Sequence, residues 1–102
     1  MILEEPKYDV EGLKKTLWSE VQSLIDYADM LKGLIRNFED DITITKEKAA
    51  LFLNSGQTQN HGYLIEKIQE TEARIKTCIN CVAECEAQIE HKRDLLRLYV
   101  LF

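Results

Sequence analysis

The fold is decided by residues 10–53, which read VEGLKKTLWSEVQSLIDYADMLKGLIRNFEDDITITKEKAALFL. Apolar residues recur here in two rows, each with a period of seven residues. The first row consists of Val10, Leu17, Leu24, Leu31, Phe38, Thr45 and Phe52, and the second of Val21, Ala28, Ile35, Ile42 and Ala49. Alternating steps of three and four residues are typical of the a and d positions of a coiled coil. The stretch therefore predicts one long helix.

The second half of the chain repeats this pattern. Its rows are Ile68, Ile75, Val82, Ile89 and Leu96, and Leu64, Thr71, Cys78, Cys85, Lys92 and Tyr99. Between the halves, residues 54–62 (NSGQTQNHG) contain no large apolar side chain. We therefore expect an all-α protein with one domain over residues 1–102, built from a helix over about 9–53, a loop over 54–62 and a helix over about 60–101. Two helices of equal length and a short polar loop predict an antiparallel hairpin.

The register of the hairpin follows from arithmetic on the residue numbers. Antiparallel seams pair a with d positions, so the numbers of paired residues share one sum, and 113 leaves the shortest loop. This sum places Asp41 opposite Arg74, and Lys46 and Lys32 diagonal to Glu72 and Glu86, although Glu39 then faces Glu72. It also places Lys92 at a core position opposite Val21, where its stem can be buried while its ammonium group reaches solvent, toward Glu20 or a carboxylate of a partner.

The ends of the helices carry recognisable signals. Asp9 is placed to cap the first helix, and Gly56 is placed to take the left-handed conformation after it. Thr58 or Asn60 could cap the second helix. The weakest helical stretch is residues 40–45, DDITIT, because β-branched residues lower helix propensity. We expect the helix to continue through it; a break there would produce a three-helix bundle.

A two-helix seam uses only the a and d positions, yet large apolar residues also lie at the flanking e and g positions. Extensive apolar surface outside a seam indicates an interface. We therefore expect an oligomer or an obligate complex, most simply a homodimer that forms a four-helix bundle. The residues expected to dock the partner are Trp18, Ile25, Tyr27, Leu34, Ile79 and Leu95.

Cys78, Cys81 and Cys85 form a C-x2-C-x3-C motif whose sulfurs share one helix face. Clustered thiolates can hold zinc, copper(I) or an iron–sulfur cluster. The facing seam residues cannot supply the fourth ligand that a closed tetrahedral site needs. We therefore expect the cysteines to pack as small apolar residues, with a metal-binding bundle as the alternative.

Composition narrows the classes of function. The net charge of −5 disfavours a nucleic-acid partner, and no apolar run is long enough for a transmembrane segment. His61 and His91 are isolated from any nucleophile, and no Gly-rich phosphate loop occurs, so we expect neither enzymatic activity nor a cofactor. The odd number of cysteines, three, and the absence of a signal-peptide pattern favour a cytoplasmic protein. Secretion without a cleavable signal peptide is the alternative.

These observations predict a non-enzymatic helical module for protein–protein interaction, assembly or adaptor work. Two more specific hypotheses compete. One is a secreted or secretion-partner helical hairpin, since the length and architecture resemble those of the WXG100-type secreted proteins and of the helical partner proteins that travel with larger toxins. The resemblance is one of architecture alone, because residues 54–62 lack Trp-x-Gly and no Tyr-x-x-x-Asp/Glu follows the second helix. The other hypothesis is a small acidic phage or mobile-element inhibitor that docks on a basic partner.

Overall fold

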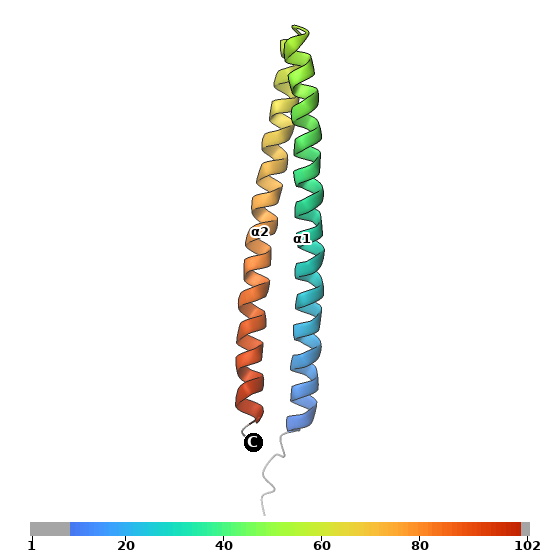
Figure 1. The fold of residues 1–102 in the computed structure, drawn as a ribbon. Coiled ribbons are helices and arrows are strands. Elements are labelled where there is room, and N and C mark those ends of the chain that lie inside the picture. The colour runs from blue at the N-terminus through green and yellow to red at the C-terminus, as the bar shows by residue number, and fades with distance from the viewer. Residues whose placement is uncertain (1–8, 101–102) are drawn as a thin grey trace, which may run out of the picture.

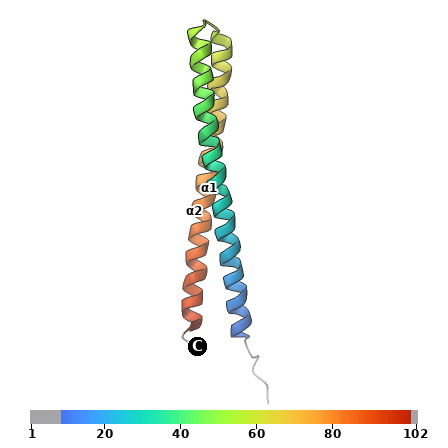
Figure 2. The ribbon, with the colours of Figure 1, turned by 45° about the vertical axis from the view of Figure 1, so that its right-hand side comes forward.

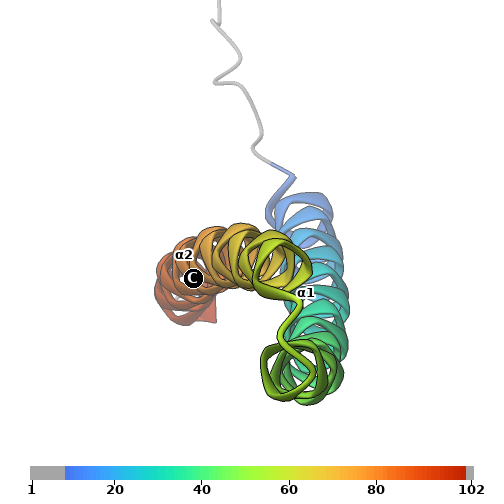
Figure 3. The same ribbon diagram turned by 90° about the horizontal axis from the view of Figure 1, so that it is seen from above.

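The structure, a computed structural model, describes residues 9–100 and consists of two helices, α1 (Val10–Asn54) and α2 (Thr58–Val100). The helices run antiparallel and lie side by side over a length of 69 Å (Figure 1). Figures 2 and 3 show that they wind about each other, as helices with a seven-residue apolar repeat do. The predicted all-α hairpin is confirmed.

The core of the hairpin is the seam that the two apolar rows predict. All eight buried residues occupy a or d positions, and the remaining a and d residues of α1 and α2 are half-buried. The buried residues are Val21, Ala28, Leu31, Ala49, Ile68, Cys85, Ile89 and Leu96. The seam is therefore one layer of side chains thick, and everything outside a and d borders on solvent.

Contacts between the helices agree with the predicted register. Leu17 and Leu24 pack against a cluster that contains Ile89 and Leu96. The Lys32 ammonium lies 3.6 Å from the Glu86 carboxylate. These contacts lie in the half of the hairpin nearer its open end, and they agree with one register along that half.

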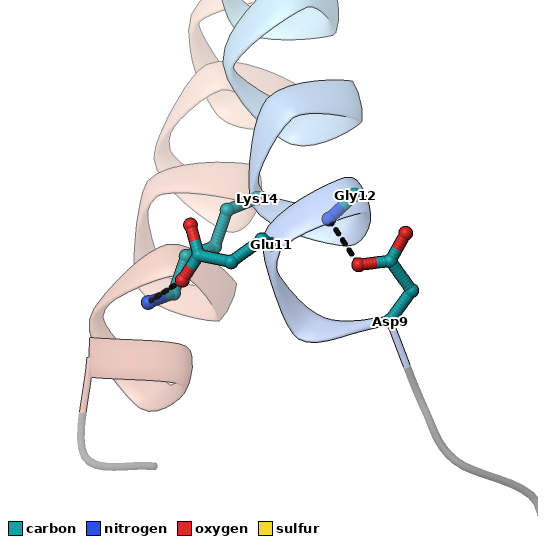
Figure 4. A network of polar contacts seen from close by, with 4 residues as sticks. All are labelled: Asp9, Glu11, Gly12 and Lys14. Atoms are coloured by element: carbon teal, nitrogen blue, oxygen red, sulfur yellow. Dashed lines mark hydrogen bonds and ion pairs between the residues drawn. The ribbon is translucent and has the colours of Figure 1, made fainter.

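The start of α1 is capped as expected. The Gly12 amide donates to the Asp9 carboxylate at 2.8 Å (Figure 4). The Leu13 amide donates to the Asp9 carbonyl at 2.9 Å. Lys14 and Glu11 form an ion pair in the same first turn (Figure 4). The cap satisfies amides that the helix itself leaves without a partner.

The loop is shorter than predicted. Only residues 55–57 connect the helices, so residues 58–62, which were expected in the loop, form the first turn of α2. Gly56 has a φ of +76°, its amide donates to the Leu53 carbonyl at 3.1 Å, and the Gln57 amide donates to the Phe52 carbonyl at 2.9 Å. This is a Schellman motif, which ends a helix within a few residues.

The expected capping of α2 by Thr58 or Asn60 is wrong, because α2 begins at Thr58 and both residues therefore lie inside the helix. Gln57 precedes the helix instead. Its carbonyl accepts from the His61 amide at 3.0 Å, and its side-chain oxygen accepts from the Asn60 side chain at 2.7 Å. His61 consequently lies at a half-buried a position of the seam.

The helix continues through residues 40–45, as expected. Thr43 and Thr45 donate their hydroxyls to the carbonyls of Glu39 and Asp41, at 3.1 and 2.7 Å. Threonine can stay helical when its hydroxyl bonds to the preceding turn. Ile42 and Thr45 are half-buried in the seam, so packing against α2 outweighs their low helix propensity.

Two glycines should respond to alanine in opposite directions. A Cβ added to Gly33 would meet nothing within 4 Å, whereas Gly56 has a left-handed backbone. We expect Gly33→Ala to raise the free energy of unfolding by about 0.5–1 kcal/mol, and Gly56→Ala to lower it by about 1 kcal/mol. Chemical denaturation followed by circular dichroism measures both. A destabilising Gly33→Ala would show that residue 33 lies in an interface rather than in solvent.

Candidate functional site

The most distinctive feature of the surface is its apolar content. Among residues 9–99, eleven large apolar residues are exposed: Leu13, Trp18, Tyr27, Met30, Leu34, Ile44, Leu51, Leu53, Tyr63, Ile79 and Leu98. Single exposed apolar residues are ordinary, but contiguous groups mark sites that contact another molecule. The question is therefore whether these residues are scattered or gathered.

Heptad positions decide this, because a hairpin has two open faces. Positions g and c of both helices lie on one face, here called the g/c face, and positions e and b lie on the other, here called the e/b face. Eight of the eleven residues lie on the g/c face: Leu13, Tyr27, Met30, Leu34, Ile44, Leu51, Tyr63 and Leu98. Only Trp18, Leu53 and Ile79 lie on the e/b face. The exposed apolar residues are thus gathered on one face.

Shallow grooves between the helices lie on both faces. Leu34 shares a groove of about 350 Å³ with Phe38, Ala73, Arg74, Thr77 and Cys78, on the g/c face. Trp18 shares one of about 260 Å³ with Lys14, Arg93, Leu96 and Arg97, on the e/b face. Each groove joins residues of α1 to residues of α2. These two grooves therefore have mostly apolar surfaces, but they differ in the charged residues that line them, which are Arg74 on the g/c face and Lys14, Arg93 and Arg97 on the e/b face.

The six residues predicted to dock a partner do not form one surface. Tyr27, Leu34 and Leu95 lie on the g/c face, whereas Trp18, Ile25 and Ile79 lie on the e/b face. Ile25 and Leu95 are half-buried, and the other four are exposed. The structure therefore divides the predicted site into two halves on opposite sides of the hairpin.

Sequence reasoning did not assign the apolar residues at the c positions to a docking surface; these are Met30, Ile44, Leu51, Tyr63 and Leu98. Each follows a g position by three residues, so these side chains lie next to the g positions, on the same face of the hairpin. That spacing was visible in the sequence. It was overlooked because only the positions directly flanking the seam were considered.

Charge separates the two faces further. On the e/b face, Lys32 pairs with Glu86, and the apolar residues are surrounded by charged ones. The charged residues at its e and b positions are Glu11, Lys15, Asp29, Lys32, Arg36, Glu39, Lys46, Glu72, Lys76, Glu86, Glu90, Arg93 and Arg97. The g and c positions carry only Glu20, Asp41, Lys48, Lys67, Glu70, Arg74 and Glu84. Removing the g/c face from water therefore costs less free energy of desolvation than removing the e/b face.

Lys92 is the one lysine at an a or d position of α2, and its side chain is arranged as predicted. Its ammonium donates to the Glu20 carboxylate at 2.7 Å, while its side chain is only 25% exposed. The stem thus covers apolar surface, and the charge reaches the g/c edge of the hairpin.

Replacing Lys92 tests whether its stem or its charge matters more. An ion pair at the surface contributes about 0.2–1 kcal/mol, less than a buried leucine side chain. We expect Lys92→Leu to raise the free energy of unfolding by about 1 kcal/mol and Lys92→Ala to lower it by about as much. Urea denaturation at low and high salt measures both. A destabilising Lys92→Leu would mean that the ion pair contributes more than packing.

The cysteine motif lies along the seam. Cys85 is buried, and Cys78 and Cys81 are half-buried, with all three thiols free. Among residues 9–100, no group of three His, Cys, Asp or Glu side chains is arranged to hold a metal ion. Cys85 packs as a small apolar residue, as buried free cysteines do.

Zinc offers a direct test of the metal alternative. A ligand that binds only the folded chain raises its stability, and structural zinc does so strongly. We expect one equivalent of zinc to move the thermal midpoint of the reduced protein by less than about 1 °C, a shift that corresponds to a small fraction of 1 kcal/mol. A larger rise that Cys85→Ala abolishes would establish a metal site.

Within the described part of the chain, neither helix contains a segment apolar enough to cross a membrane. Comparison of the chain with protein families, with curated proteins and with solved structures found no match. The case for function therefore depends on the surface of the hairpin.

Proposed function

We propose that this protein is a non-enzymatic module for protein–protein interaction and assembly, and that it docks a partner through an apolar helix face. The observation that carries the proposal is the concentration of eight exposed large apolar residues on the g/c face. Each contributes up to about 1.5–3 kcal/mol when removed from water, in proportion to its exposed area. A surface of this kind gains more from contact with another protein than from solvent.

The partner we propose first is a second copy of the chain. Two hairpins that pack face to face form a four-helix bundle, in which each helix gains a second apolar neighbour. Symmetric pairs are the commonest oligomers of soluble proteins. In such a bundle the single-layer seam becomes part of a thicker core.

Three features support a role without chemistry. No polar or charged side chain is buried among the described residues, so none is held in the dry surroundings that tune catalytic groups. The grooves on both faces are open and mostly apolar. Charged residues are distributed along the exposed helix positions, where they keep the assembly soluble.

Light scattering across a dilution series, in reducing buffer, tests the proposal. We expect a mass of two chains at micromolar concentration and dissociation only on strong dilution, because an apolar interface of this extent favours association. Raising the salt concentration should leave the mass unchanged, since burial of apolar surface does not depend on charge pairs. A single-chain mass at every concentration would contradict self-association.

A further inference from the structure

We infer that the second copy docks on the g/c face in antiparallel orientation. The twofold axis that relates the copies runs between them, perpendicular to the helices, at the level of Leu34. The inference rests on the proposed function and adds which face is covered and how the copies are oriented. In this arrangement α1 packs against α1 of the second copy, and α2 against α2. The turn of each hairpin lies beside the open end of the other.

The choice of face follows from exposure and charge. The g/c face holds eight of the eleven exposed large apolar residues and about half as many charged residues as the e/b face. Covering either face would desolvate one ion pair between the helices, Lys92–Glu20 at the edge of the g/c face or Lys32–Glu86 on the e/b face, but covering the e/b face would also bury the cations around Trp18. Desolvating charges costs free energy that the three apolar residues of that face would not offset.

The area of the face suffices for a stable dimer. The hairpin is 69 Å long, and two adjacent helices, each about 10 Å across, make a face about 20 Å wide. Such a face offers on the order of 1,400 Å² per copy, against about 800 Å² per partner in a standard stable interface. A fully overlapping pair of hairpins therefore exceeds what association needs.

The orientation follows from the polarity of the few charges on this face. The half nearer the open end carries Glu20 and Glu84, whereas the half nearer the turn carries Lys48, Lys67 and Arg74 together with Asp41 and Glu70. The formal charge of the g and c positions is therefore negative in the first half and slightly positive in the second. Copies in antiparallel orientation place the acidic half of one against the basic half of the other. Electrostatic complementarity of this kind fixes the register of an interface.

Individual pairs match about the proposed axis. Glu20 and Lys48 are equidistant in sequence from Leu34, so Glu20 of each copy lies level with Lys48 of the other. Glu84 and Arg74 are likewise equidistant from Ile79, which the 113 register places level with Leu34. Of the residues the structure describes, none forms an ion pair with Lys48, Arg74 or Glu84, whereas Glu20 already pairs with Lys92 and would share its carboxylate between Lys92 and Lys48 of the second copy.

The two acids in the basic half also find suitable neighbours. Asp41 lies level with Tyr27 of the second copy, and Glu70 lies level with Gln88, so a hydroxyl and an amide can donate to the two carboxylates. Leu95 of one copy lies level with Tyr63 of the other, and the Leu34 residues of the two copies lie level with each other. The exception is Lys67, which lies level with His91. With the turns at the same end, by contrast, Lys48 would lie within two residues of the level of Lys67 of the second copy.

Leu34 and Ile79 supply a matched pair of variants for the choice of face. They lie at the same level of the hairpin on opposite faces, and they are 38% and 52% exposed. We expect Leu34→Glu to raise the dimer dissociation constant at least a hundredfold, because two leucines on the axis are replaced by like charges. Ile79→Glu should change it by less than about threefold, the size of a single surface-charge effect.

Sedimentation equilibrium measures both constants, and circular dichroism checks that each variant stays helical. A dimer that Ile79→Glu dissociates and Leu34→Glu leaves intact would overturn the choice of face, while the proposed self-association would stand. A parent chain that is monomeric throughout would overturn both. The two failures are therefore distinguishable.

Charge reversal tests the orientation. We expect Arg74→Glu to raise the dissociation constant about fivefold, since two symmetry-related pairs become repulsive. The double variant Arg74→Glu/Glu84→Arg should return it to within about twofold of the parent value, because the reversed charges again face each other. Failure of Glu84→Arg to restore affinity, with restoration by Asp41→Arg instead, would overturn the antiparallel orientation in favour of turns at the same end.

Discussion

The fold of this molecule depends on burial of the seven-residue apolar repeat of α1 against the corresponding repeat of α2, which runs antiparallel to it. The a and d residues of α1 and α2 meet along a single seam, and all eight buried residues lie in it. Neither helix has another neighbour in the described chain. Burial in the seam is therefore the only long-range interaction of any size that holds the helices together, with two ion pairs between the helices at its edges.

The thinness of the seam has a direct functional consequence. A pair of helices can cover only the a and d positions, so both open faces remain in contact with solvent. Evolution can leave such faces polar, as the e/b face of this hairpin mostly is. The g/c face instead carries aromatic and aliphatic side chains, and its few charges are divided between the two ends. An apolar surface with charge polarity is what a self-complementary interface requires.

Local interactions set the length of the hairpin more tightly than composition suggested. The polarity of residues 54–62 resembled that of a loop, but polar residues are also compatible with the first turn of a helix. The Schellman motif at Gly56 ends α1 abruptly and turns the chain within residues 55–57. Thr58 to Gly62 then extend the seam by one turn, which places His61 at an a position. Backbone hydrogen bonding, rather than side-chain polarity, decides where a helix begins.

The sequence by itself determined the all-α class, the two helices, their register and the cap at Asp9, because these follow from periodicity and local hydrogen bonding. Tertiary structure decided the rest. The continuation of α1 through residues 40–45 depends on packing of Ile42 and Thr45 against α2. The division of Trp18, Ile25 and Ile79 from Tyr27, Leu34 and Leu95 depends on which way each flanking position faces once the seam has formed. A list of apolar residues carries no such direction, since the two faces of a hairpin exist only after its helices have paired.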